Sequence, residues 1–411
     1  MMNVPHQAFE PLTIGPLTLR NRIIKAATNE GMAPGGIPSR QLVKLHAALA
    51  EGGVGMTTLA YCSVSPDGRT LPGQIVLDAS TVPHLRALTD AVHRHGAAAS
   101  AQITHGGCFT FLRERSTPRP LSSSGGFNKV GMMSGMWRKQ AMSEVEMTQV
   151  VYQFAQGAVL AREAGFDAVE LHMGHGYLLS QFISPLYNKR RDQYGGSLEN
   201  RLRFPLRVLR AVLKAVGNDL AVICKYSITD GVRGGNTAED GAAIAKLLEQ
   251  GGAHLLVLSA GMNVESITTM FGSSFPKENR VKAGNPLIGL AMALQRLKEP
   301  QVEFRELYLL EHARKVRAAV KMPLVYLGGV SSQRGIEQAL AEGFDAVALG
   351  RGLICQPDFV NQMVQGVSRH SGCTACNRCV AMMYTPGGTS CVLGPAGDAR
   401  LNAQPAAAPL S

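Results

Sequence analysis

The chain has 411 residues, of which 45% are hydrophobic and only 17% are charged. A chain of this composition can bury a large hydrophobic core, which excludes a wholly disordered protein. No apolar run reaches the ~18–20 residues that cross a bilayer, and no basic start precedes an apolar block, so we expect a cytoplasmic protein without membrane contact. The net charge of +11 is dispersed, which argues against a nucleic-acid partner and fits a basic surface.

A helix–glycine–strand unit recurs along the chain. Residues 161–171 read AREAGFDAVEL and residues 339–349 read ALAEGFDAVAL, and fainter copies occupy 47–60 and 245–261. In each copy a glycine that can adopt the left-handed conformation ends a helix before a short apolar strand. Four such units predict a repeated βα architecture with a parallel sheet.

The remaining apolar runs complete a set of eight predicted strands, with amphipathic helices such as 144–163 and 198–216 between them. Eight parallel strands favour a closed (βα)8 TIM barrel of the α/β class over an open doubly wound sheet. The strands are expected near 22–27, 54–60, 97–103, 167–172, 220–227, 254–259, 323–328 and 345–349. Long segments follow three of them, at 105–142, 173–200 and 261–310, and we expect these at the catalytic face.

Polar residues and glycines end the predicted strands, where a barrel of this kind places its chemistry. Glycines end strands seven and eight, and together with Arg351 and the helix that follows they predict a phosphate site. The residues at the strand ends are Ala27, Thr28, Asn29, Ala60, Gln102, His172, Lys225, Ser259, Gly261, Gly328, Gly329, Gly350 and Arg351.

The fourth strand leads into the most informative segment, which contains His172, His175 and Tyr177. Polar loop residues of no special role are one interpretation, and a metal-binding pair is another. However, His-x-x-His lacks the helical spacing of zinc proteases and has no carboxylate at the expected place. Two imidazoles and a phenol suit a different task, in which the imidazoles polarise a carbonyl oxygen and the phenol supplies a proton.

This segment resembles the Old Yellow Enzyme family of FMN-dependent ene-reductases. The resemblance covers most of the chain, through LTIGPLTLRNRIIKAAT near the start, SAQITHGG at strand three, HMGHGYLLSQFISPLYNKRRDQYGGSLENRLRF after strand four, and GGV with DAVALGRGLICQPDF at strands seven and eight. It implies FMN as cofactor, NAD(P)H as reductant, and a small unsaturated carbonyl compound as substrate. The sequence leaves open whether the chain forms a homo-oligomer.

The resemblance also implies roles for individual residues. His172 and His175 would hold the substrate oxygen, and Tyr177 would protonate the α-carbon while hydride from the flavin attacks the β-carbon. Gln102 and Lys225 would contact the flavin pyrimidine ring. The other cofactor residues would be Ala27, Thr28, Asn29 and Ala60 along the isoalloxazine, and Gly328, Gly329, Gly350 and Arg351 at the phosphate. Asn29 stands where the family usually has Thr or Cys, and this departure argues against a covalent flavin.

Half of the eight cysteines lie near the C-terminus, as Cys373, Cys376, Cys379 and Cys391. The C-x2-C-x2-C-x11-C spacing is typical of a metal site, and it resembles the iron–sulfur segment of the 2,4-dienoyl-CoA reductase branch. A [4Fe–4S] cluster, a zinc ion and an empty remnant remain open. We expect the barrel to span 1–365, a Cys-rich extension 366–395, and a disordered Ala/Pro-rich tail 396–411.

The function expected first is therefore reduction of activated C=C bonds in enones, enoates or enoyl thioesters. A dienoyl-CoA reductase-like iron–sulfur flavoprotein is the alternative. A more distant alternative is an aldolase-type barrel with Lys225 as a Schiff-base lysine, although no residue near it in the sequence indicates a depressed pKa.

Overall fold

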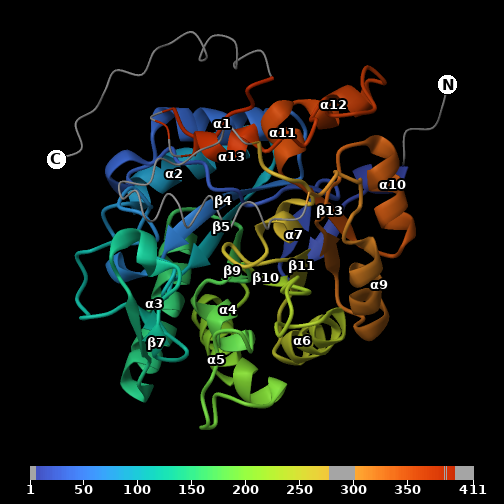
Figure 1. Ribbon diagram of the computed structural model, residues 1–411. Coiled ribbons are helices and arrows are strands. Elements are labelled where there is room, and N and C mark those ends of the chain that lie inside the picture. The colour runs from blue at the N-terminus through green and yellow to red at the C-terminus, as the bar shows by residue number, and fades with distance from the viewer. Residues whose placement is uncertain (1–5, 277–300, 384, 386, 394–411) are drawn as a thin grey trace.

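The computed structural model describes residues 6–276, 301–383, 385 and 387–393, and its centre is a closed barrel of eight parallel strands (Figure 1). Strand order around the barrel follows the chain, and the last strand pairs with the first. The predicted TIM barrel is confirmed, and each barrel strand overlaps a predicted range. The strands are β3 (Ile23–Lys25), β4 (Met56–Ser63), β5 (Ala98–Thr104), β9 (Ala168–Met173), β10 (Ala221–Ser227), β11 (Leu255–Ser259), β12 (Leu324–Tyr326) and β13 (Ala346–Leu349).

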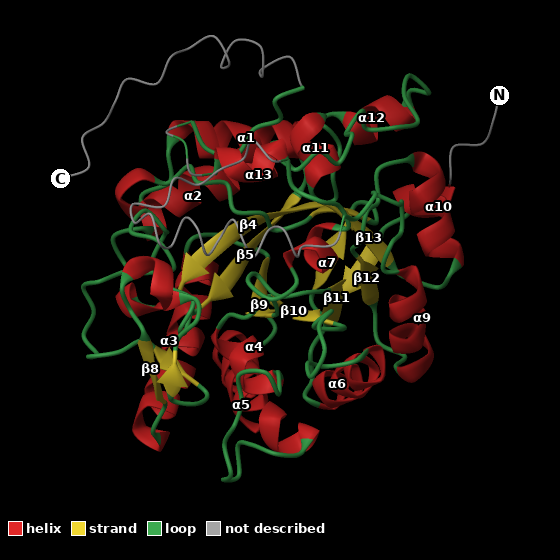
Figure 2. Cartoon of the chain, viewed as in Figure 1, coloured by secondary structure: helices red, strands yellow, loops and turns green. Residues whose placement is uncertain are grey.

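Helices surround the barrel on its outside, as Figure 2 shows by the red ring around the yellow strands. The repeated glycines end helices as predicted, because Gly53, Gly165, Gly252 and Gly343 have φ values of 106°, 81°, 91° and 85°. The helices along the barrel are α1 (Arg40–Glu51), α2 (Val82–His93), α3 (Glu144–Glu163), α5 (Leu198–Val216), α6 (Ala238–Gln250), α9 (Leu310–Ala319) and α10 (Gln333–Ala341).

The barrel interior is apolar at its N-terminal end. Alternate residues of the strands, among them Ala168, Ile223 and Val257, face inward and form one buried cluster. The same cluster includes Leu12 and Ile14 from a hairpin of β1 (Leu12–Ile14) and β2 (Leu17–Leu19), which closes this end. Ligands can therefore enter only from the opposite, C-terminal end of the strands.

The three long segments hold small elements at that end. Residues 105–142 form a sheet of β6 (Leu121–Ser122), β7 (Gly126–Phe127) and β8 (Arg138–Ala141). Residues 173–200 contain α4 (Leu178–Ile183), and the described part of 261–310 contains α7 (Ile267–Phe271).

The C-terminal part of the chain folds back onto the barrel rim through α11 (Arg351–Cys355), α12 (Phe359–Val364) and α13 (Arg378–Met382). Thr389 N donates to the carbonyl of Glu30 at 2.6 Å, so the Cys-rich segment contacts the loop after β3. The boundary between barrel and extension at residue 365 stays a prediction, and the tail at 396–411 lies outside the described residues. Among the described residues, none of the helices is long and apolar enough to cross a membrane.

Candidate active site

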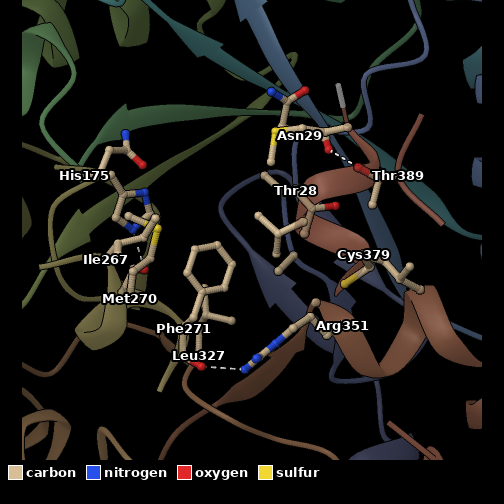
Figure 3. Close-up of a pocket in the computed structure, with 18 of the residues that line it drawn as sticks. Thr28, Asn29, His175, Ile267, Met270, Phe271, Leu327, Arg351, Cys379 and Thr389 are labelled. Carbon is tan, nitrogen blue, oxygen red and sulfur yellow. Dashed lines mark hydrogen bonds between the residues drawn. The ribbon is translucent and has the colours of Figure 1, made fainter. Parts of the chain in front are cut away.

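A cavity opens at the C-terminal ends of the strands, and most of the predicted site residues line it. Figure 3 shows His175 on one side of this cavity and Arg351, Cys379 and Thr389 on the other. Ala60, Gln102 and Gly328 are not part of the lining. The predicted residues that line the cavity are Ala27, Thr28, Asn29, His172, His175, Tyr177, Lys225, Gly329, Gly350, Arg351, Cys373 and Cys379.

Three neighbouring strands supply the polar floor of the cavity. His172 of β9 is paired with Lys225 of β10, and Lys225 is paired with Val257 of β11. Because side chains alternate along a strand, Ser259 faces the same way as Val257, into the barrel. The inward face of each strand thus changes from apolar to polar where it reaches the cavity.

The two histidines form a hydrogen-bonded pair. Gly174 N donates to Nδ1 of His172 at 3.3 Å, so the proton of a neutral His172 ring is on Nε2. His172 Nε2 lies 3.3 Å from Nδ1 of His175, whose Nε2 lies 2.7 Å from the hydroxyl of Ser259. These contacts make one chain in which each imidazole donates through Nε2.

Both rings are neutral because they are buried. Burial lowers the pKa of His172 and that of His175 well below the usual 6.5, and the nearby charge of Lys225 lowers both further. His175 also has a φ of 62°, a strained conformation for a non-glycine residue, and its N–H donates to the Ser227 hydroxyl at 3.2 Å. Backbone strain of this kind is typical of residues whose position matters for function.

Tyr177 follows the histidines and is 3% exposed. Its ring contacts that of His172 edge to face at 4.7 Å between centroids, and its hydroxyl donates to the hydroxyl of Tyr61 at 2.9 Å. The structure therefore brings together the three residues that the sequence predicted as catalytic, and it adds Tyr61, which also lines the cavity.

Three buried polar residues lie where the barrel strands end. Gln102 Nε2 donates to a carboxylate oxygen of Glu170 at 2.6 Å, and the Lys225 ammonium donates to the carbonyl of Ala27 at 3.3 Å. Burial raises the pKa of Glu170, and attraction to Lys225 opposes that rise. Burial likewise lowers the pKa of Lys225. The sequence alone did not indicate this lowered pKa.

Of these three residues, Lys225 lines the cavity and fits the pyrimidine edge of a flavin. Gln102 Oε1 is buried without a hydrogen-bond partner among the described residues, but Gln102 does not line the cavity, so its contact with the flavin stays a prediction. Lys225 offers a cation to the adjacent carbonyl and ring nitrogen, where negative charge collects on reduction. The position of Lys225 is thus compatible with the cofactor that the sequence implied.

The predicted phosphate residues lie together at the end of β12 and β13. Gly329 and Gly350 line the cavity, and Gly329 has a φ of 80°. The Arg351 guanidinium donates to the Ser273 hydroxyl at 2.9 Å, the Asn377 side chain at 2.5 Å and the Phe271 carbonyl at 2.6 Å. An anion beside the glycines would therefore meet a guanidinium that protein acceptors already hold in place. Gly328 instead accepts from the Tyr326 hydroxyl at 3.0 Å through its carbonyl.

Two of the C-terminal cysteines, Cys373 and Cys379, line the same cavity, and Cys376, Cys391 and a fifth cysteine, Cys355, lie near them. Cys355 hydrogen-bonds to Cys391, and burial raises its pKa to about 12. Burial also raises the pKa of Cys379 to about 12 and raises that of Cys373. Within the described part of the chain, which includes all five, no three metal-binding side chains are arranged to hold an ion. The predicted iron–sulfur or zinc site is thus not supported by the geometry.

Sequence reasoning missed four residues that contribute to the site. Tyr61 and Glu170 lie on predicted strands or directly after them, and their place could have been found from strand alternation. Lys25 and Glu30 form a buried ion pair beside the loop that carries Thr28, with exposures of 1% and 2%. Lys25 and Glu30 are only five residues apart, but the sequence does not show that both charges are buried.

Comparison with known proteins identifies the chain's relatives. Residues 7–290 match the model of the NADH:flavin oxidoreductase / NADH oxidase family. The chain is 42% identical over 389 residues to the 4,4'-dithiodibutanoate disulfide reductase of Rhodococcus erythropolis, covering 94% of both proteins. It is 28% identical over 361 residues to a multifunctional alkene reductase/demethylase of Caballeronia cordobensis, covering 87% of this chain and 49% of that protein.

A solved structure of 2-naphthoyl-CoA reductase in complex with 2-naphthoyl-CoA has the same fold. It superimposes with a TM-score of 0.81 at 24% identity, and covers 97% of this chain and 58% of that one. The chain thus spans about half the length of two of these relatives and nearly all of the disulfide reductase.

Proposed function

The chain belongs to the NADH:flavin oxidoreductase / NADH oxidase family, also called the Old Yellow Enzyme family, and from this we propose that it reduces C=C bonds conjugated to a carbonyl group. As a member it is a flavin-dependent oxidoreductase that uses NADH or NADPH. The observation that carries the proposal is the placement of Tyr177 against a neutral histidine pair in the cavity that Lys225 also lines.

The neutral imidazoles suit the substrate's oxygen. A neutral ring donates one N–H and carries no charge, so it polarises a carbonyl without competing as an acid. His172, His175 and Ser259 lie along the same hydrogen-bonded chain, so the imidazole donors are held in place before the substrate arrives, and the substrate's oxygen would replace one acceptor of that chain. Bound FMN would supply hydride taken from NAD(P)H.

Tyr177 completes the addition by giving its proton to the α-carbon. The carbanion that forms there is a strong base, so a phenol of ordinary acidity can protonate it. The ring lies edge to face with Phe109 at 5.4 Å as well as with His172, so the hydroxyl is held in one orientation.

Tyr177→Phe tests this function. We expect the variant to be reduced by NAD(P)H at the normal rate and to transfer hydride to an enone about 10²–10⁴ times more slowly. Stopped-flow absorbance of the flavin measures the two half-reactions separately. Equal reoxidation rates for the variant and the parent protein would refute the assignment of Tyr177.

Disulfide reduction is a second candidate, favoured by the 42% identity to a disulfide reductase along nearly the full length of both chains. A leaving thiol has a pKa near ~8.5 and departs as thiolate without a general acid, unlike an α-carbanion. Tyr177→Phe should therefore slow enone reduction while sparing disulfide reduction. Reoxidation of the reduced variant by each acceptor in turn distinguishes the two.

A further inference from the structure

A second tyrosine lies next to Tyr177 at the mouth of the cavity. Tyr61 belongs to β4, one residue after Ala60, and lines the cavity. Its hydroxyl accepts from the hydroxyl of Tyr177 at 2.9 Å. Tyr61 is partly exposed whereas Tyr177 is 3% exposed, so Tyr61 is the more accessible member of the pair.

Ring packing holds this contact in place. Tyr61 stacks on His172 with centroids 5.8 Å apart and ring planes at 24°, and it meets Tyr177 edge to face at 5.3 Å. His172 and Tyr177 are themselves in contact at 4.7 Å. The three rings therefore fix one another, and the two hydroxyls cannot separate without disturbing the stack.

After Tyr177 gives up its proton, its charged oxygen needs a hydrogen-bond donor, and Tyr61 is placed to provide one. Once its proton has moved to the substrate, Tyr177 is a tyrosinate in a site that is almost closed to water, and a buried anion without a donor is costly. The histidines direct their protons along the chain to Ser259. Tyr61, in contrast, has its hydroxyl at hydrogen-bond distance from the oxygen that becomes charged.

We propose that Tyr61 is the proton-relay partner of Tyr177, an inference that rests on the proposed C=C reduction. As the Tyr177 O–H bond breaks and the C–H bond at the α-carbon forms, Tyr61 donates a hydrogen bond to the Tyr177 oxygen. In the same transition state the Tyr61 proton begins to move to the Tyr177 oxygen, so the Tyr61 O–H bond breaks as that of Tyr177 re-forms, and water afterwards returns a proton to Tyr61. No electrons move in these steps. Tyr61 acts through Tyr177 and is therefore a positioning residue.

Tyr61→Phe removes the hydroxyl and keeps the ring that stacks on His172. We expect hydride transfer to a saturating enone to slow about tenfold to a hundredfold, the loss of one hydrogen bond to a charged oxygen. Reduction by NAD(P)H and the affinity for the enone should stay unchanged. Tyr152→Phe, at an exposed tyrosine of α3, is the matched control and should behave as the parent protein.

Mixtures of H2O and D2O provide a readout that a purely structural role would not change. The reoxidation rate of the parent protein should depend on deuterium fraction along a curve, because two protons move, and that of Tyr61→Phe along a straight line. Tyr61→His keeps a ring and a proton donor, so it should restore part of the rate and the curvature. If Tyr61→Phe loses flavin, Tyr61→Leu, which also lacks the hydroxyl, replaces it in the assay.

The outcomes separate the relay from the proposed function. If the reduced parent protein is not reoxidised by any enone, the proposed function fails and the relay with it. If the parent protein reacts and Tyr177→Phe is slow, but Tyr61→Phe retains the parent's rate and curved isotope dependence, only the relay is refuted.

Discussion

Lys225→Met tests the predicted position of the flavin beside β10. Methionine nearly matches the length of lysine and removes the charge from a side chain that is 4% exposed. A hydrogen bond to a charged group contributes about 1.5–3 kcal/mol. If Lys225 stabilises the negative charge of reduced flavin by that amount, the two-electron potential falls by about 30–65 mV in the variant.

The same substitution removes the stronger of the two cations, Lys225 and Lys25, that oppose the effect of burial on Glu170. The pKa of Glu170, already raised by burial, should rise further, so the carboxyl becomes neutral and the fold survives. Lys225→Arg should keep the potential near that of the parent protein, and Lys246→Met, at an exposed lysine of α6, should not change it. The assay is equilibrium reduction of the flavin against a reference dye. A potential that does not change in Lys225→Met would show that the flavin does not lie beside this lysine.

Three further predictions follow from particular contacts. His172→Ala should weaken binding of a phenolic ligand roughly tenfold, because one hydrogen bond is lost. His84→Ala, on the surface of α2, is the control and should leave this affinity unchanged. Flavin difference spectra measure both affinities. Burial lowers the pKa of His46 well below 6.5, so the folded state binds fewer protons than the unfolded state, and stability is lost as the pH falls below about 6.5. His46→Gln should reduce the slope of the unfolding free energy against pH in this range by up to about 1.4 kcal/mol per pH unit. Urea titrations at several pH values measure this slope, and an unchanged slope would contradict the prediction. Asn377→Ala removes a side chain that hydrogen-bonds to both Ser273 and Arg351 and so holds the Cys-rich segment to the barrel. The segment should therefore be cleaved faster by protease in the variant than in the parent protein. Equal cleavage rates for the two proteins would contradict this role of Asn377.

The barrel could be predicted because its signal is local and repeated. The glycine at the end of a helix and the apolar strand after it lie within about ten residues of each other, and the two clearest copies share the run GFDAV. The small sheet of β6, β7 and β8 could not be predicted, because strands of two to four residues are too short to show a period.

The site was predictable where motif and strand end coincide, as at His172, His175 and Tyr177. Residues whose role comes from contacts distant in sequence were missed. Tyr61 is 116 residues from Tyr177, and Gln102 is 68 residues from Glu170, so neither pairing is visible before the strands are placed. Glu170 could still have been noticed, because it lies two residues before His172 on the inward face of β9.

The most direct test of the central claim is an anaerobic titration of the purified protein, loaded with FMN, with NADH and NADPH, followed by addition of an enone. The account predicts that the flavin absorbance is bleached by at least one nicotinamide and returns when the enone is added. A protein that takes up no flavin, or a reduced flavin that enones leave reduced, would contradict it.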